Sequence, residues 1–419
     1  MIDIKLLREN PELFKKDLKR RKSDFPIDDV IEKDKQWRQN LYNLEQKKSL
    51  KNKVSAEISK TKDKTKITEM KKLGDEIKKL EEKVAKQEAD VRSMLMRTPN
   101  LLHESVPYGE SDKDNAVVRK WGKAEEKSFE LKPHGEYLEE NGFADFERAT
   151  KVSGAGFYYL KGDLVFLDLA LMKFALDCLA KKGYTPTETP LMMTRKAYEG
   201  VTDLSDFEKV MYKIENEDEY LIATSEHPMA AMYMDEIIPN EALPIKLAGI
   251  SQCFRREIGS HGVDTKGLFR VHQFNKIEQF IFCEPKDSWK LHEELLKNAE
   301  EIMQALEIPY RVVNVCTGDI GTVAAKKYDI EAWSPREKKY FEVASCSNCT
   351  DYQARRLNIR AGKSGGEKRM LHTLNSTAIA TSRVLRAILE NHQQKDGSIT
   401  IPKALQPHFG KAKITPKKK

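Results

Sequence analysis

The chain has 419 residues, of which 39% are hydrophobic and 33% are charged, and its formal net charge is +7. This length predicts two or three domains rather than one core. No apolar run approaches the ~18 residues of a transmembrane helix, and residues 1–5 lead into charge rather than a secretory signal, so we expect a cytoplasmic protein without a membrane partner.

The basic excess is confined to the first quarter of the sequence. Residues 1–100 contain 27 Lys and Arg against 19 Asp and Glu, whereas the remaining residues contain 46 against 47. A basic segment on a nearly neutral body favours a polyanionic partner such as nucleic acid. A solvated helical surface explains the same charge equally simply.

Two stretches of this basic segment have the period of a coiled coil. Hydrophobic residues, with Gln87 at one position, step alternately by three and four over 70–94, and the same template fits 27–58 with an interruption at Asp34 and a displaced stripe further on. The polar run 61–66 separates the stretches. The pattern predicts an antiparallel hairpin of two helices, each about 45–50 Å long.

From about residue 105 the pattern changes to short strands, turns and isolated helices. Leucine spacing predicts a helix over 164–178 that Gly183 can terminate. The two prolines of 184–190 indicate an edge or interface strand. We therefore divide the chain into an N-terminal domain at 1–104, a larger domain at 105–410 and a basic, disordered tail at 411–419.

Several common motifs are missing from the sequence. Neither a Gly-x-x-x-x-Gly-Lys-Ser/Thr loop nor a Gly-x-Gly-x-x-Gly fingerprint occurs. Cys346 and Cys349 form a C-x-x-C without a second pair or a His pair nearby. Structural zinc needs four ligands, so we expect two buried or half-buried free thiols.

The densest cluster of chemically useful side chains lies in residues 246–283, which read as strand, polar loop and strand. Period-two alternation places on one surface the residues Arg255, Glu257, His272, Phe274, Lys276 and Glu278. Guanidinium groups bind phosphate, an aromatic ring stacks on a base, and a carboxylate holds an ammonium or amino group. The alternative interpretation is an exposed hairpin with ordinary ion pairs.

Five segments, in this order along the chain, resemble the seryl-tRNA synthetase family of class II aminoacyl-tRNA synthetases. They are Pro190 for motif 1, Thr224-x-Glu226 for the serine motif, 254–257 with 267–274 for motif 2, Glu-x-x-Ser-Cys-Ser-Asn at 342–348, and 372–378 leading to Arg383 for motif 3. The hairpin resembles the family's tRNA-binding arm. The resemblance implies an α+β fold: an antiparallel-sheet catalytic domain with flanking helices, plus the N-terminal coiled-coil hairpin.

The resemblance also implies a role for each matched residue. It assigns ATP to Arg255, Arg256, Glu257, Arg270, Val271, Phe274, Glu342, Val343, Ala344, Ser345 and Arg383. It assigns serine to Thr224, Ser225, Glu226, Arg255, Glu278, Asn375 and Thr377, with either Asn375 or Thr377 closing the pocket. Glu342 and Ser345 would hold Mg²⁺. Strand alternation puts these two on opposite faces, so both reach one metal only if the strand bulges or ends there.

In this family L-serine is activated with ATP to seryl-adenylate and transferred to the 3′ end of tRNA(Ser), and of tRNA(Sec) where present. The resemblance therefore implies ATP, Mg²⁺, L-serine and tRNA as ligands, and a homodimer through the region around Pro190. The intact Thr224-x-Glu226 motif favours the form that binds serine without zinc.

Two other functions compete with this interpretation. A non-catalytic coiled-coil scaffold or RNA-binding protein explains the hairpin but leaves the cluster at 246–283 without a purpose. A related ligase that charges a carrier protein explains the cluster, but such relatives lack a long tRNA-binding arm.

Overall fold

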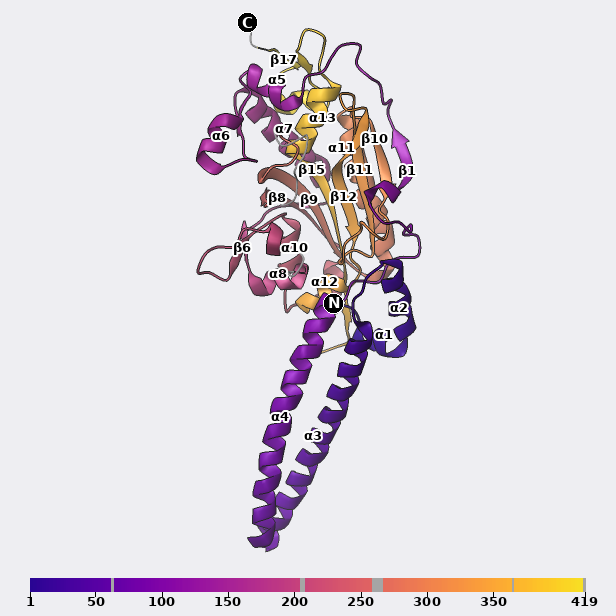
Figure 1. The fold of residues 1–419 in the computed structure, drawn as a ribbon, viewed down its shortest axis with the longest axis vertical. Coiled ribbons are helices and arrows are strands. Elements are labelled where there is room, and N and C mark those ends of the chain that lie inside the picture. Colours follow the sequence, from indigo (N-terminus) through magenta and orange to yellow (C-terminus); the bar gives the residue numbers. More distant parts are fainter. Residues whose placement is uncertain (62–63, 204–207, 258–266, 364, 417–419) are drawn as a thin grey trace. The chain divides into compact units, whose positions relative to one another are not determined.

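The computed structural model describes residues 1–61, 64–203, 208–257, 267–363 and 365–416. The chain divides into two compact units, Met1–Leu101 and Leu102–Lys419. Figure 1 shows the elements of each unit. No helix within the described ranges combines the length and the apolar character needed to cross a membrane.

The first unit is helical, and its elements are α1 (Ile4–Glu9), α2 (Pro11–Arg20), α3 (Ile27–Thr61) and α4 (Lys64–Arg97). Helix α2 begins at Pro11, where a residue without an N–H loses no helical hydrogen bond. The long helices α3 and α4 lie side by side, so the predicted hairpin is confirmed (Figure 1). We call residues 27–97 the arm.

The arm is held by the predicted seam. Leu44, Ile77 and Val84 are buried between α3 and α4, with four half-buried residues packed around them, namely Trp37, Leu41, Leu73 and Leu80. The helices are longer than the sequence suggests, because polar residues expected in the turn at 61–66 continue both helices. Residues 62–63, which follow α3 and precede α4 in the sequence, lie outside the described residues.

Asp34, which interrupts the apolar period, is buried at the base of the arm. Its two carboxylate oxygens accept hydrogen bonds from Arg8 at 2.9 and 2.6 Å and from Arg38 at 2.9 Å. Since a buried carboxylate is tolerated only when it is paired, these two guanidinium groups explain why an acid fits the seam. The pairing also ties α1 to α3.

The second unit is built on an eight-stranded sheet. Its spatial order is β1 (Ala116–Trp121), β10 (Tyr310–Asn314), β11 (Lys326–Ser334), β12 (Lys339–Asn348), β15 (His372–Ala380), β9 (Gln273–Cys283), β8 (Ile245–Phe254) and β4 (Thr185–Glu188). All neighbours are antiparallel except β4, which runs parallel to β8. The Pro-rich segment is thus an edge strand, as predicted, and the predicted antiparallel class of sheet is confirmed.

Helices cover both faces of this sheet (Figure 1). Helices α7 (Asp163–Ala180), α11 (Ser288–Ala305) and α13 (Thr381–Asn391) share one core with Ile277 and Ile281 of β9. Helices α8 (Arg195–Val201), α10 (Glu226–Ala231) and α12 (Tyr352–Leu357) share a second core with Phe280 and Phe282. Strand alternation therefore divides β9 between two cores.

Shorter elements complete the second unit. Among the described residues, the other helices are α5 (His134–Glu140), α6 (Phe146–Ser153) and α14 (Gln406–Phe409), with 3-10 turns at Asp112–Asp114, Glu208–Val210, Asn240–Ala242 and Pro285–Asp287. The small strands are β2 (Ala144–Asp145), β3 (Tyr159–Leu160), β5 (Met192–Thr194), β6 (Glu219–Leu221), β7 (Ile237–Ile238), β13 (Arg360–Gly362), β14 (Lys368–Met370), β16 (Ile399–Thr400) and β17 (Lys413–Ile414).

The C-terminal segment differs from the disordered tail expected at 411–419. Lys413–Ile414 pairs with Ile399–Thr400, and the Ile414 side chain is fully buried. A single apolar residue in a lysine-rich run is a weak signal for a strand. In the fold, however, Ile414 packs into the main core of the second unit. Residues 417–419 lie outside the described part of the chain.

The buried seam predicts how the arm responds to truncation of one side chain. Replacing Leu44, which is 4% exposed, with Ala should cost about 2–5 kcal/mol, because the lost methyl groups leave a cavity between the helices. Hydrogen exchange within residues 27–97 should accelerate accordingly. Tyr42→Ala, which truncates a 61% exposed side chain, is the matched control and should change exchange little. Equal protection in both variants would contradict this packing.

Candidate functional site

Four central strands place polar side chains on one face of the sheet. On β9, Ile277 and Ile281 enter the core beneath α7 and α11, so Phe274, Lys276 and Glu278 point to the opposite face. The same alternation applies to β8, whereas β12 and β15 each contain an irregularity of register. The three β9 residues that the sequence pattern grouped therefore lie on one face of the sheet in the structure.

Strand β12 contains the irregularity that Glu342 and Ser345 require. The pairing of β12 with β11 skips Val343, which makes this residue a β-bulge. As a result Val343 and Ala344 are both buried in succession, and both join the core. Glu342 and Ser345 then fall on the same side of the strand, although regular alternation would separate them.

A pocket at this face collects most of the residues expected to bind ATP. Its lining includes Arg255, Glu257, Val271, Phe274, Glu342, Val343, Ala344, Ser345 and Arg383, together with Thr377. Arg256 and Arg270 do not line it, and their side chains are exposed. We call this the nucleotide pocket.

Arg255 and Phe274 lie against each other at the edge of the nucleotide pocket. The guanidinium carbon of Arg255 is 5.3 Å from the centre of the Phe274 ring. Arg255 Nε donates to the carbonyl oxygen of Ala223 at 3.2 Å. One nitrogen is thereby fixed to the backbone, which orients the remaining guanidinium N–H groups.

Arg383 and Glu342 form an ion pair across the nucleotide pocket. Arg383 donates to the backbone carbonyl of Glu342 at 3.0 Å and lies 3.2 Å from its carboxylate. Burial alone would raise the pKa of Glu342, but Arg383 and Lys327 outweigh burial and lower it. Glu342 is therefore a carboxylate throughout the neutral range.

Glu226 is the centre of a second polar group, which also includes residues that the resemblance assigns to serine. Its Oε1 accepts from Gln353 Nε2 at 3.2 Å and from Asn375 Nδ2 at 3.0 Å. Gln353 carries no motif signal in the sequence, because α12 brings it into position only in the folded chain. Asn375 thus contacts one acid of the group.

Glu278 is the other acid, and a buried lysine joins it to Thr224. Lys276 Nζ lies 2.5 Å from the Glu278 carboxylate and donates to the Thr224 hydroxyl at 3.1 Å. Thr377 pairs with Glu278 across the strands and is hydrogen-bonded to its carboxylate. Each of the two alternative pocket-closing residues, Asn375 and Thr377, therefore serves a different acid.

The two acids have unusual acidities because they are buried together. Burial raises the pKa of Glu226 to about 7, and the neighbouring Glu278 adds to the rise. Burial also raises the pKa of Glu278, against the opposing influence of Lys276. A cationic group bound between them would favour the ionised form of both.

Ser225 is also among the residues that the resemblance assigns to substrate serine, but its side chain turns away from Glu226 and Glu278. It is fully buried, and its hydroxyl donates to the carbonyl oxygen of Gly249 at 3.2 Å. A β-carbon on Gly249 would lie 2.8 Å from that hydroxyl. Ser225 therefore holds the N-terminal end of helix α10 against β8, and its hydroxyl does not face the acids.

A larger cavity of about 520 Å³ adjoins both groups. It shares Ser345 with the nucleotide pocket and Glu226 and Asn375 with the acids, and Lys327 forms part of its wall. Lys327 lies 3.2 Å from the buried Asp329 carboxylate. Strand alternation in the sequence grouped Lys276 with the site but assigned it no ligand, whereas no local pattern marks Lys327.

The two cysteines of the C-x-x-C have separate surroundings. Cys346 donates to the carbonyl of His292 at 3.6 Å, and Cys349 accepts from Asn375 Nδ2 at 3.7 Å. Both are buried free thiols, as expected. Burial raises the pKa of each, so both stay protonated.

Family models match both units of the chain. Residues 1–102 match the seryl-tRNA synthetase N-terminal domain, and residues 209–392 match the tRNA synthetase class II core domain (G, H, P, S and T). The serine–tRNA ligase of Methanocella arvoryzae is 57% identical over 98% of this chain and 99% of its own length. That of Methanospirillum hungatei is 58% identical over the same shares.

Solved structures agree with these relatives. The seryl-tRNA synthetase of Pyrococcus horikoshii, crystallised with ATP, is 47% identical with a TM-score of 0.96, and the similarity covers all of both chains. The cytoplasmic serine–tRNA ligase of Naegleria fowleri, in complex with AMP, is 41% identical with a TM-score of 0.89 over 100% of this chain and 99% of that one. The chain therefore belongs to the seryl-tRNA synthetase family of class II aminoacyl-tRNA synthetases.

Proposed function

We propose that this chain is an ATP-dependent serine–tRNA ligase, which forms seryl-adenylate and transfers the seryl group to the 3′ end of tRNA(Ser). The observation that carries the proposal is the meeting, on one sheet face, of a guanidinium-lined pocket with a buried pair of acids. Full-length identity with serine–tRNA ligases excludes both the scaffold and the carrier-charging alternatives. By family analogy tRNA(Sec) is a second acceptor where it exists.

In this proposal the nucleotide pocket binds ATP. Arg255 meets the α-phosphate, Phe274 stacks on adenine, and Arg383 holds the outer phosphates. Arg270, which is exposed in this structure, would join Arg383 only after its side chain turns inward. Arg256 would likewise contact the nucleotide only from the rim.

Glu342 and Ser345 are the residues that would hold Mg²⁺. The bulge puts a carboxylate and a hydroxyl on one side of β12, and oxygen donors of this kind suit Mg²⁺. When bound, Mg²⁺ neutralises phosphate charge as the leaving pyrophosphate forms. We propose no structural zinc, because the C-x-x-C thiols are protonated and separately bonded.

The buried acids would bind the amino acid. Glu226 and Glu278 hold the serine ammonium and hydroxyl, with Thr224 oriented by Lys276. The serine carboxylate then attacks the α-phosphorus in line, and Arg255 stabilises charge on both reactants. No protein nucleophile takes part, so catalysis is positioning plus charge stabilisation.

The adjoining cavity of about 520 Å³ would receive the terminal adenosine of the tRNA. A ribose hydroxyl, by family analogy the 3′ one, attacks the adenylate carbonyl and releases AMP. Lys327 in the cavity wall supplies positive charge beside the departing phosphate. The cavity borders both pockets, which is the placement that transfer requires.

A second copy of the chain would cover the apolar surface near Pro190. Helix α7 exposes Val165, Phe166 and Leu169, and Leu191 and Met192 are also exposed beside the motif 1 proline. Exposed apolar patches of this kind mark association surfaces. We propose that the enzyme is a homodimer of the cytoplasm.

The decisive experiment on the function is serine-dependent exchange between ATP and pyrophosphate, measured with and without tRNA. Arg255→Ala should lower exchange about 100-fold or more, because a guanidinium contact to developing charge is worth about 3 kcal/mol. Arg148→Ala, which removes an arginine that is 74% exposed, is the control and should leave exchange near wild type. Exchange by Arg255→Ala within tenfold of wild type, with the fold intact, would reject the assigned role.

The pKa of Glu226, which burial and Glu278 raise to about 7, predicts how serine binding depends on pH. Only the carboxylate form holds an ammonium group, so protonation competes with serine. The Kd for serine should therefore rise by up to about tenfold for each pH unit below about 7. Calorimetric titrations with serine from about pH 7.5 to about pH 5.5 measure this slope.

Glu226→Gln provides the control for the pH experiment. This variant should bind serine weakly at every pH and should lack the slope. A wild-type Kd that stays flat across the range would contradict the assignment of Glu226 to the serine ammonium.

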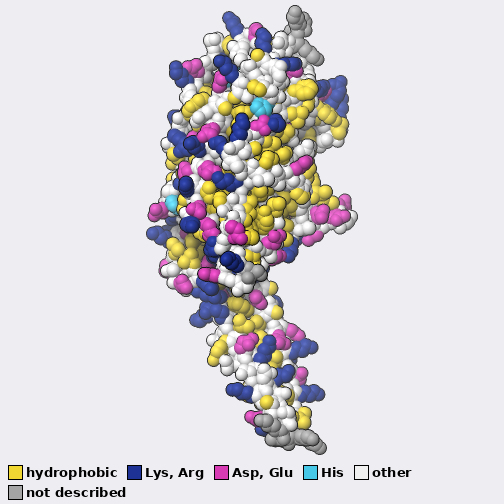
Figure 2. Space-filling model, turned by 180° about the vertical axis from the view of Figure 1, so that it is seen from behind, with side chains coloured by type: hydrophobic (Ala, Val, Ile, Leu, Met, Phe, Trp, Pro, Cys, Tyr) yellow, Lys and Arg dark blue, Asp and Glu magenta, His cyan; other side chains and the backbone are white. Residues whose placement is uncertain are grey.

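The arm is proposed to grip tRNA. Figure 2 shows Lys and Arg side chains spread along it among Asp and Glu. Some of these lysines are paired across the hairpin, for example Lys47 with Glu76 at 2.6 Å and Lys48 with Glu81 at 3.0 Å. Exposed pairs of this kind contribute little stability, so the lysines can exchange carboxylate for phosphate at low cost.

The hydrogen bond between Asn40 and Gln87, 2.9 Å long, marks a place where the hairpin can be shortened. Removing residues 41–86 and joining these neighbours with a short Gly linker keeps the Asp34 cluster. Exchange should persist and tRNA charging should fall at least about tenfold, with a flatter salt dependence of tRNA binding, since phosphate contacts release counterions. Normal charging by the shortened enzyme would sink the proposal for the arm and leave the catalytic assignment standing.

A further inference from the structure

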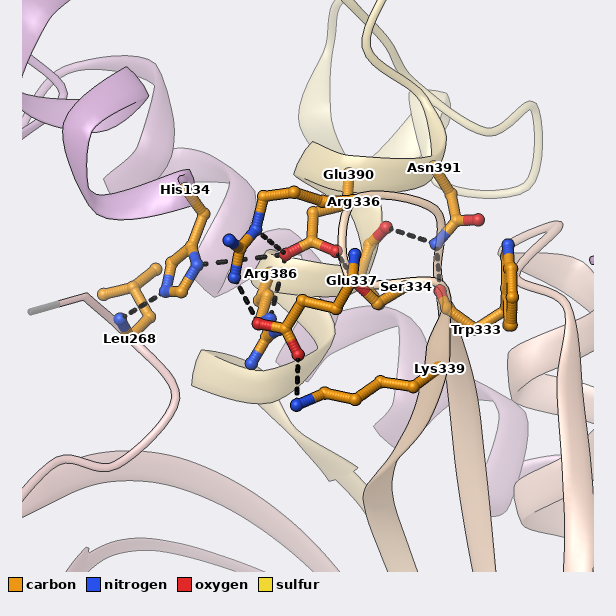
Figure 3. A network of polar contacts seen from close by, with 11 residues as sticks. His134, Leu268, Trp333, Ser334, Arg336, Glu337, Lys339, Arg386, Glu390 and Asn391 are labelled. Atoms are coloured by element: carbon orange, nitrogen blue, oxygen red, sulfur yellow. Dashed lines mark hydrogen bonds and ion pairs between the residues drawn. The ribbon is translucent and has the colours of Figure 1, made fainter. Parts of the chain in front are cut away.

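Helix α13 carries a fully buried arginine, Arg386, which does not line the nucleotide pocket. Arg386 has no exposed surface, and it donates to Glu390 at 2.9 Å and pairs with Glu337 at 2.6 Å. Figure 3 shows these groups converging with Arg336 and Lys339. Apolar residues would fill such a site at lower desolvation cost, so stability alone does not explain the arginine.

The guanidinium of Arg386 also packs against two aromatic rings. Its central carbon lies 4.6 Å from the centre of the Phe269 ring and 4.4 Å from that of Phe341. The two rings meet edge to face at 5.6 Å and 86°. Contacts of a cation with a ring are strongest when water is excluded, as it is here.

Phe269 connects this buried cluster to the nucleotide pocket. Its ring forms part of the pocket wall, and the guanidinium carbon of Arg383 lies 5.3 Å from the ring centre. Arg383 also contacts Glu342, which is the carboxylate expected at Mg²⁺. Of these two contacts of Arg383, the one with the Phe269 ring does not involve a residue that would hold Mg²⁺.

The backbone beside Phe269 is fixed by the same cluster. The N–H of Leu268 donates to His134 Nε2 at 2.9 Å, and the other ring nitrogen of His134 lies 3.9 Å from Glu390 (Figure 3). Burial and the nearby Arg386 lower the pKa of His134 to about 3, so the ring is neutral and its nitrogen accepts. Phe269 is thus held through its neighbour as well as through its ring.

We infer that Arg386 is a positioning residue of the ATP site, which orients the phosphate-binding Arg383 through the ring of Phe269. The inference rests on the proposed function, because it takes Arg383 as a ligand of the outer phosphates. Arg386 itself does not touch the substrate. Its loss should weaken ATP binding and leave serine binding unchanged.

The test compares variants of the full-length enzyme in serine-dependent exchange, with the KM for ATP, the KM for serine and the Tm measured for each. Arg386→Met and Phe269→Leu should each raise the KM for ATP about 3- to 30-fold, the range that a desolvated cation–ring contact supports. The KM for serine should stay within about twofold. Phe269→Tyr, which keeps the ring, should restore the wild-type KM for ATP.

Arg336→Met is the matched control. Arg336 belongs to the same cluster, where it lies 3.7 Å from the Glu390 carboxylate and pairs with that of Glu337. This variant should lower the Tm much as Arg386→Met does, without changing the KM for ATP. A shift in the KM for ATP of equal size in both arginine variants would show that Arg386 acts only through stability.

The remaining outcomes also decide the question. If Arg386→Met does not fold, Phe269→Leu and Phe269→Tyr carry the test, because Phe269 is only half-buried at the pocket wall. An unchanged KM for ATP in Phe269→Leu would overturn the inference. Wild-type enzyme without serine-dependent exchange would instead overturn the proposed function, so the two failures are distinguishable.

Discussion

Buried charge is the constraint on which the rest of the second unit depends. A sheet face that carries ionisable side chains away from water is stable only if each charge meets an opposite one. The structure meets this requirement in pairs, which are Lys276 with Glu278, Lys327 with Asp329, and Arg386 with Glu337 and Glu390. Arg383 and Glu342 form a further pair that is partly exposed at the nucleotide pocket. The pairs near the pockets leave their charges positioned for phosphate, ammonium and metal, so the same balance that permits folding prepares the site.

Much of this site could be predicted from the sequence, because strand alternation is local. The grouping of Phe274, Lys276 and Glu278 follows from period two alone, and the hairpin follows from the heptad seam. The sequence also posed the question of how Glu342 and Ser345 share a face. It could not place the answer, since the bulge at Val343 depends on pairing with a strand elsewhere in the chain.

The features that the sequence did not reveal have a common physical origin in contacts between distant segments. Ser225 sits in a matched motif, yet its hydroxyl satisfies a carbonyl on β8 and faces away from the acids. Gln353 and Lys327 reach the site from elements whose own sequences show no pattern. In the sequence Asp34 only interrupts the hydrophobic seam. In the folded chain it is paired with Arg8 and Arg38, and so connects α1 to α3.

The bulge in β12 has a consequence for changes in chain length. The extra residue, Val343, shifts the alternation of side chains in the second half of the strand by one position. Glu342 and Ser345, which are three positions apart, share a face only because of this shift. Deleting Val343 would restore regular pairing and leave Glu342 and Ser345 two positions apart, so both oxygen donors would stay on the same face of the strand. Loss of the bulge at constant chain length would instead turn one of the two oxygen donors toward the hydrophobic core, so the site depends on the number of residues between the two donors as well as on their identity.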